Sequence, residues 1–229
     1  QNLMFTATFS NPFRKLAKEM ADKAIEISVT TDGEAGENIE HYCHPVDKSR
    51  KAELLIELIE TQNWDQALVF TRTKHGADRL QKQLEKVEIS AKAIHGNKTQ
   101  NNSMKALDAF KNNRVKILVA TDVAARGIDI KKMSQVINFD VPTVAKDYIH
   151  RIGRTGRGGD KGKAITLVSA DEFRILSDIE KLLGQKLERV EIEGFEPEHV
   201  VPAKEKQKPK NKKFHNRGGF KNRRRSRKG

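Results

Sequence analysis

Short apolar runs alternate with segments of helical periodicity along most of this chain, and this alternation constrains the fold more than any other feature. Residues 67–70 are apolar at every position, which is typical of a strand buried on both faces. Residues 75–86 instead place Ala77, Leu80 and Leu84 on one helical face. The alternation continues, with expected strands at 67–70, 90–95, 115–120, 135–139 and 164–169 and expected helices at 54–59, 75–86, 103–111, 143–152 and 171–183. We therefore predict an α/β fold, a parallel sheet with helices on both faces.

The pattern also divides the chain into four parts. Residues 1–30 read as strand, helix and strand, and a Gly- and acid-rich stretch without periodicity at 31–38 is typical of a linker. The regular pattern occupies 39–195. Residues 196–229 lack the apolar side chains needed to offset chain entropy, so we expect this tail to be disordered on its own. Because the chain begins at Gln1 within an apolar run, we expect it to be a piece of a longer protein.

The positive charge of the chain is concentrated in the tail. The formal net charge is +13. Residues 203–229 hold 13 of the 44 basic residues and one of the 31 acidic residues, which leaves a tail of +12 and a body of +1. Such asymmetry is expected of a basic arm that binds a polyanion.

Several classes of protein are excluded by what the chain lacks. A single cysteine, Cys43, rules out an internal disulfide and fits a reducing compartment such as the cytoplasm. His41 and His44 lie close to it, but strand-like alternation would point Cys43 and His44 to opposite faces, so we expect no zinc site. No apolar run approaches the roughly 20 residues that span a bilayer, and no signal-peptide pattern is present, so we expect no membrane partner.

The segment from 147 to 159 combines basic side chains with four glycines. Its donors are His150, Arg151, Arg154 and Arg157. On a helix, Arg154 and Arg157 would share one face because they are three residues apart. Guanidinium groups at that spacing suit a polyphosphate, whose charge must be neutralised in a fixed geometry during phosphoryl transfer. The alternative is a basic, Gly-rich loop that is merely solvated.

Polar clusters follow three of the predicted strands, at the carboxyl ends where parallel sheets bind ligands. They begin at Thr71, His95 and Thr121. Each could simply cap a helix, and the last could be an ordinary strand-to-helix loop capped by Asp122. Three clusters at adjacent strand ends point instead to a groove for a phosphate backbone, in which Asp129 could accept hydrogen bonds from ribose hydroxyls.

The phosphate cradle of a nucleotide-hydrolysing domain, Gly-x-x-x-x-Gly-Lys-Ser/Thr, is missing. The only Gly-Lys pair begins at Gly162 and is followed by Ala164, and the position five residues before Gly162 is Arg157. Asp171 and Glu172 lie at a predicted helix start, which favours a cap over a metal site. We expect this chain to hold a nucleotide from one side only and to bind no metal itself.

In their order and spacing, these motifs resemble those of the DEAD-box ATP-dependent RNA helicases. The matching segments are Thr6-Ala7-Thr8 (motif III), 69–74 (motif IV), 120–130 (motif V) and 150–157 (motif VI). The resemblance covers nearly the whole chain up to Phe195. Residues 95–100 and 194–197 are similar to the bacterial RhlE-type branch of the family.

The resemblance implies that 39–195 is the second RecA-like domain and that 1–30 is a remnant of the first. In the family, ATP and Mg²⁺ bind between the two domains, and the first domain supplies the phosphate cradle, the DEAD acids and the metal. The protein's partners would be RNA and its own N-terminal domain, with Thr6, Ala7 and Thr8 coupling the two. Lacking Walker A and DEAD motifs, this chain alone would be inactive.

The resemblance also assigns roles to individual residues. Arg154 and Arg157 would act as arginine fingers, and His150 and Arg151 would couple to motif III and the DEAD acids across the cleft. Gly127 and Asp129 would approach the nucleotide. The residues implied in RNA binding are Thr71, Arg72, Gly96, Gln100 and Thr121 in the domain and Arg217, Arg223, Arg224 and Arg225 in the tail.

One departure from the family concerns the residues after Gln100. The family has Arg three residues later, where this chain has Ser103, with Lys105 nearby. Two other functions stay open at this point. One is an RNA-binding or annealing module without nucleotide chemistry, and the other is a DNA-translocating helicase or a helicase-like nuclease subunit. The sequence does not decide whether the protein forms a homo-oligomer.

Overall fold

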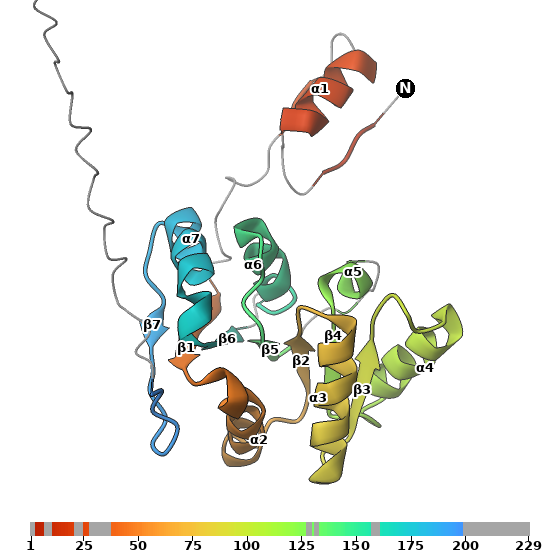
Figure 1. Ribbon diagram of the computed structural model, residues 1–229. Coiled ribbons are helices and arrows are strands. Elements are labelled where there is room, and N and C mark those ends of the chain that lie inside the picture. Colours follow the sequence, from red (N-terminus) through yellow and green to blue (C-terminus); the bar gives the residue numbers. More distant parts are fainter. Residues whose placement is uncertain are drawn as a thin grey trace, which may run out of the picture.

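A single sheet of seven parallel strands organises the chain, in the order β3-β4-β2-β5-β6-β1-β7 (Figure 1). The computed structural model describes residues 3–6, 11–20, 25–27, 38–126, 130, 133–156 and 161–198. The strands are β1 (Ile39–Pro45), β2 (Ala67–Phe70), β3 (Ala91–Ile94), β4 (Ile117–Ala120), β5 (Gln135–Asn138), β6 (Gly162–Val168) and β7 (Glu188–Arg189). The parallel α/β fold predicted from the sequence is confirmed.

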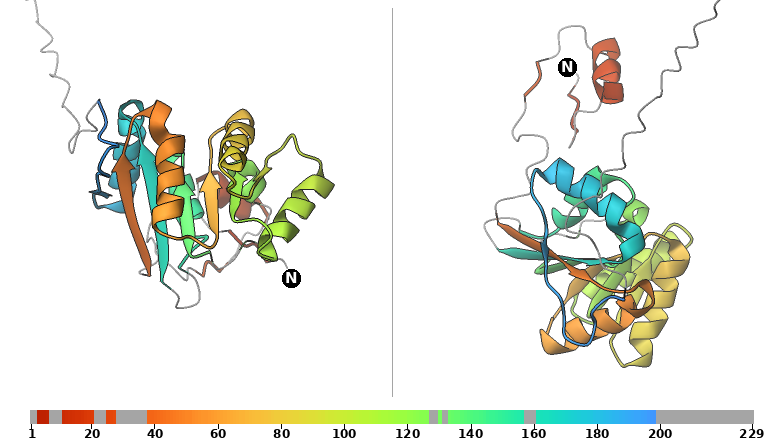
Figure 2. Two further views of the ribbon diagram at one scale, coloured as in Figure 1. Left: turned by 90° about the horizontal axis from the view of Figure 1, so that it is seen from below. Right: turned by 60° about the vertical axis from the view of Figure 1, so that its left-hand side comes forward.

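Helices cover both faces of this sheet (Figure 2). They are α2 (Lys51–Thr61), α3 (Lys74–Lys86), α4 (Gln100–Lys111), α5 (Asp122–Ala125), α6 (Ala145–Ile152) and α7 (Phe173–Leu183), with 3-10 turns η1 (Lys48–Arg50) and η2 (Ala170–Glu172). A further helix, α1 (Asn11–Met20), precedes them in the chain. Successive residues of β2 show why both faces are apolar. Ala67 and Val69 pack with α2 and α3, whereas Leu68 and Phe70 pack with α4 on the other face. A third cluster joins α6 and α7 to β1 and β6.

Local side chains set where the helices begin and end. The Thr73 Oγ1 accepts a hydrogen bond from the Gly76 amide at 3.0 Å, so α3 starts at Lys74. The Thr99 Oγ1 does the same for the Asn102 amide at 3.2 Å, so α4 begins at Gln100, three residues earlier than predicted. Gly184 ends α7 in the left-handed conformation, with φ of 68°, as expected. The two-residue β7 and the one-turn α5 were not predicted because both are too short to show periodicity.

The N-terminal segment confirms its helix but not its strands. Helix α1 begins at Asn11, and none of its residues is buried. Residues 3–6 and 25–27, where strands were expected, are not in strands. That prediction was wrong for these residues because a strand requires a hydrogen-bonded neighbour, and apolar content alone does not supply one. Residues 7–10 and most of the predicted linker at 31–38 lie outside the described residues.

Candidate functional site

Three neighbouring strands end level with one another at one edge of the sheet. In the register, Phe70 of β2 and Ile94 of β3 both pair with Ala120 of β4. The segments that start at Thr71, His95 and Thr121 therefore leave the sheet side by side. This confirms the expectation that the three polar clusters occur at adjacent strand ends.

Only some of the predicted ligand-contacting residues at this edge are exposed. Arg72, Gly96 and Gln100 face solvent. A Cβ placed on Gly96 would meet no atom within 4 Å, so a ligand backbone can approach the loop closely. Thr71 is fully buried, and its amide and hydroxyl donate to the carbonyls of Ala120 and Thr73. The Thr71 side chain is therefore enclosed within the domain, and its implied contact with RNA stays a prediction.

The Arg72 guanidinium is held against the edge by a buried carboxylate. Its Nη2 donates to Glu172 Oε1 at 2.7 Å, and the Arg72 amide donates to Asp140 Oδ2 at 2.8 Å. The Arg72 side chain stays 37% exposed, whereas that of Glu172 is 4% exposed. The guanidinium is thus oriented from behind while its outer face stays open to a ligand.

Glu172 also pairs with a buried lysine. The Lys51 Nζ donates to Glu172 Oε2 and to the carbonyls of Phe139 and Leu167 at 2.9 and 2.8 Å. Burial lowers the pKa of Lys51, and the charge of Glu172 opposes that shift. The predicted cap is also confirmed, because Ser169 and Glu172 form a capping box at η2. No sequence pattern indicates that Glu172 pairs with Lys51, which lies 121 residues away.

Arg151 is a second buried hub behind the strand ends. Its guanidinium grips Asp122 with two hydrogen bonds of 2.7 and 2.8 Å. It also donates to the Asn138 side chain and the Asp140 carbonyl at 3.2 and 2.7 Å, and it stacks over Phe70. Only 2% of Arg151 is exposed. Its position ties α6 to the loop after β4, and the coupling across a cleft that the resemblance implied stays a prediction.

Arg154 follows the end of α6, in a turn with a fixed backbone. Because α6 ends at Ile152, the helical face expected for Arg154 and Arg157 does not form at Arg154. The Arg154 amide donates to the Arg151 carbonyl, and its carbonyl accepts from the Met133 amide at 3.2 Å. The next residue, Thr155, packs so closely on Gly162 that a Cβ there would lie 2.1 Å from its hydroxyl. Arg154 itself is half-buried.

The remaining predicted residues divide into two groups. His150 is half-buried on α6, Thr121 is 9% exposed at the start of α5, and Thr6 lies in the short described segment before α1. The predicted site residues outside the described part of the chain are Ala7, Thr8, Gly127, Asp129, Arg157, Arg217, Arg223, Arg224 and Arg225.

Among the described residues, no three or more His, Cys, Asp and Glu side chains come together in a way that could hold a metal ion. Within the same residues, no helix has the length and apolar character needed to cross a membrane.

Comparison with known proteins identifies the family. A model of the helicase conserved C-terminal domain matches residues 50–159. The ATP-dependent RNA helicase DbpA of Bacillus subtilis is 38% identical over 217 residues, which cover 92% of this chain and 45% of that protein. The DEAD-box ATP-dependent RNA helicase RhpA of Helicobacter pylori is 36% identical over 88% of this chain and 41% of its own length. The chain thus spans less than half of these curated relatives.

Solved structures agree with this match. The E. coli DEAD-box protein SrmB, in a complex with RraA, is 32% identical with a TM-score of 0.66, covering 74% of this chain and 99% of the SrmB chain. S. cerevisiae Dbp5 bound to RNA and ADP BeF3 is 34% identical with a TM-score of 0.73, covering 82% of this chain and 50% of Dbp5. Assignment to the RhlE-type branch stays a prediction. The aligned strand ends, the Arg154 turn and these matches together place the chain in the DEAD-box RNA helicase family, as a carrier of its RecA-like C-terminal helicase domain.

Proposed function

We propose that this chain is the C-terminal half of an ATP-dependent RNA helicase that remodels or unwinds short RNA duplexes. The observation that carries the proposal is that one domain presents two groups of donors. Arg72, Gly96 and Gln100 lie at the strand ends, and Arg154 lies in the turn after α6. The similarity to ATP-dependent RNA helicases, and to a DEAD-box protein bound to RNA, supports this assignment.

The Arg154 turn suits a phosphate group of ATP. An arginine side chain neutralises charge that develops during phosphoryl transfer best when the backbone of the residue is held in place. The close packing of Thr155 on Gly162 holds the backbone next to Arg154. Arg157 would act with Arg154 as an arginine finger, and Gly127 and Asp129 would contact the nucleotide. ATP would bring Mg²⁺, held by an N-terminal RecA-like domain. That domain would be the chain's obligatory partner.

The strand ends suit the backbone of single-stranded RNA. Arg72 offers an oriented guanidinium, Gly96 permits close approach, and Gln100 opens α4 with an exposed amide. Contacts of this kind position a strand without reading its sequence, so we expect low sequence specificity. Thr121 lies beside them with little exposed surface, and Arg217, Arg223, Arg224 and Arg225 of the tail would add salt-sensitive tethering.

Arg151 links the two groups within the domain. It holds Asp122, at the start of the loop after β4, and lies three residues before Arg154. A movement of that loop would therefore be transmitted to the turn after α6 through the buried Arg151 side chain. His150, on the more exposed part of α6, would make the contact across the cleft to Thr6, Ala7 and Thr8.

The test is a steady-state ATPase assay of the full-length protein with RNA, with DNA and with neither. We expect RNA-selective stimulation. Equal stimulation by DNA would favour a DNA-translocating helicase. RNA binding without stimulated hydrolysis would overturn the proposal in favour of an RNA-binding or annealing module.

A further inference from the structure

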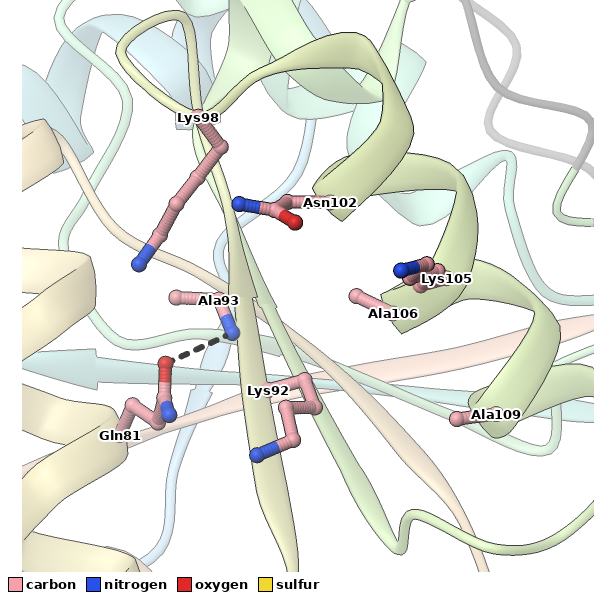
Figure 3. Close-up of a pocket in the computed structure, with 8 residues that line it drawn as sticks. All are labelled: Gln81, Lys92, Ala93, Lys98, Asn102, Lys105, Ala106 and Ala109. Carbon is pink, nitrogen blue, oxygen red and sulfur yellow. Dashed lines mark hydrogen bonds between the residues drawn. The ribbon is translucent and has the colours of Figure 1, made fainter.

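A cavity opens at the outer edge of the sheet, on β3 between α3 and α4 (Figure 3). Its volume is about 310 Å³, at the lower end of the range for small-ligand sites. Its lining residues are Gln81, Lys92, Ala93, Lys98, Asn102, Lys105, Ala106 and Ala109. Because Lys98 and Asn102 follow the exposed residues Gly96 and Gln100, the cavity continues the edge that we propose binds RNA.

One face of α4 forms a wall of the cavity. Asn102, Lys105, Ala106 and Ala109 lie at the i, i+3, i+4 and i+7 positions of that face. The alanines leave the space empty, and the polar side chains stand above them. Figure 3 shows the Asn102 amide pointing from α4 toward Lys98, with Lys105 one turn further along the helix. The wall thus combines small apolar contacts with cationic and amide donors, which suits a nucleotide unit.

The lining carries three lysines and no carboxylate. Two of the lysines have acidic neighbours, with Lys98 Nζ 2.9 Å from Asp78 and Lys92 Nζ 3.4 Å from Glu85. Such exposed pairs contribute little energy and can exchange for a phosphate. Within the described parts of the chain, no ion pair engages Lys105. Lys105 is therefore the most readily recruited cation of the cavity.

The edge of β3 is not free to accept an added peptide strand at this point. The Gln81 side chain crosses from α3, and its Oε1 accepts from the Ala93 amide at 3.0 Å (Figure 3). An acidic segment that docked as an extra strand would have to displace this bond. Continuity with the strand-end donors and the blocked strand edge both favour RNA over a peptide.

We propose that this cavity is an accessory subsite for one nucleotide of single-stranded RNA, next to the nucleotides at the strand ends. Lys105 and Lys98 bind its phosphate, Asn102 donates a hydrogen bond, and its sugar or base lies against Ala106 and Ala109. The inference rests on the proposed function, because it requires that the strand ends bind RNA.

The test measures the affinity of the full-length protein for single-stranded RNAs of increasing length, as a function of salt. One variant, Lys105→Ala, removes the cation. A second, Ala109→Leu, fills the cavity without changing charge. A matched control, Lys82→Ala, removes an exposed lysine of α3 that does not line the cavity.

For RNAs long enough to reach the cavity, Lys105→Ala should reduce the slope of log affinity against log salt by about 0.7, the loss of one single-strand phosphate contact. Ala109→Leu should reduce it similarly, and Lys82→Ala should leave it unchanged. The shortest RNA that stimulates the ATPase should bind all four proteins equally.

The proposal would be overturned if Lys105→Ala and Lys82→Ala had equal effects, or if Ala109→Leu had none. Either result would mean that the lysines of the cavity attract RNA only through their general positive charge. Two results together would assign the cavity to an acidic protein segment instead. A polyglutamate peptide would bind the cavity saturably, and Lys105→Ala would leave the salt dependence of RNA affinity unchanged. Both results leave RNA-stimulated ATPase intact, whereas failure of the proposed function would abolish that stimulation in the wild type.

Discussion

Polar and charged side chains near the carboxyl ends of the strands form two groups. One group lies behind the strand ends, buried inside the domain, and the other lies in front of them, exposed to solvent. Behind the strands, Arg151, Lys51 and Glu172 are nearly fully buried, and they pair with carboxylates, carbonyls or each other. In front, Arg72 keeps 37% of its side chain exposed, and Gln100 faces solvent. Charge alone therefore does not identify a ligand-binding residue. The buried groups hold the strand ends and the loops in place, and the exposed groups remain to meet a ligand.

The same contrast occurs within one short motif. Arg151 and Arg154 lie three residues apart, yet Arg151 points into the domain and Arg154 follows the helix end in a half-buried turn. Substitutions at buried and exposed positions should therefore have separable effects, on stability for the first and on activity for the second.

The largest effect should come from Glu172→Ala. It leaves the buried ammonium of Lys51 without its carboxylate, and breaking a buried pair in this way costs about 3–5 kcal/mol. The free energy of unfolding of this chain, from denaturant titration followed by circular dichroism, measures the effect.

The adjacent pair supplies a control for that prediction. Lys48 Nζ lies 2.9 Å from Asp171, and both side chains are more than half exposed. Lys48→Ala should cost less than about 1 kcal/mol. If the two variants lost similar free energies of unfolding, burial would not explain the difference in strength between the two ion pairs.

A smaller effect is expected from Arg151→Ala. It removes the charged hydrogen bonds to Asp122 and leaves Asn138, which is fully buried, with an unsatisfied oxygen, at a cost of about 2–3 kcal/mol. The matched control is Arg126→Ala, since Arg126 also links the loop after β4 to α6, through an exposed pair with Asp147. We expect the control to lose less than about 1 kcal/mol in the same titration. An Arg151→Ala protein as stable as the wild type would contradict the inference that Arg151 holds the loop after β4 against α6.

The smallest effect concerns Cys43, the only cysteine, which is fully buried in β1. Burial raises the pKa of its thiol to about 12, so the folded state keeps the proton that the unfolded state loses above its ordinary value near 9. Stability should therefore fall as the pH rises above about 9, by about 1.4 kcal/mol at pH 10. Unfolding titrations at pH 8 and pH 10 measure this. Cys43→Ala should lose that part of the pH dependence, and an identical dependence in both proteins would contradict the burial of the thiol.

Much of the fold was predictable because its signals are local. Four-residue apolar runs identified β2 and β4, and Gly184 identified the end of α7. The alignment of the three polar clusters followed from parallel topology alone. The prediction of N-terminal strands was wrong because a strand depends on a hydrogen-bonded neighbour, which the apolar pattern does not specify.

The burial of the charged hubs was not predictable from the sequence. Lys51 and Glu172 are 121 residues apart, and neither lies in a pattern that indicates a partner. Their spacing predicts that Arg154 and Arg157 share a helical face, but spacing does not report where a helix ends, and α6 ends at Ile152. The edge cavity likewise depends on small residues, Ala106 and Ala109, that read as ordinary helix positions in the sequence.

The role of Arg154 as an arginine finger is tested by the turnover of the full-length protein carrying Arg154→Ala. Turnover is measured with saturating RNA, together with the RNA affinity and the free energy of unfolding of the same variant. An arginine finger contributes on the order of a thousandfold or more to the rate. We therefore predict a loss of at least that size, with RNA affinity within about twofold and stability within about 0.5 kcal/mol of the wild type. Normal turnover in this variant would contradict the proposed role of the Arg154 turn in nucleotide chemistry.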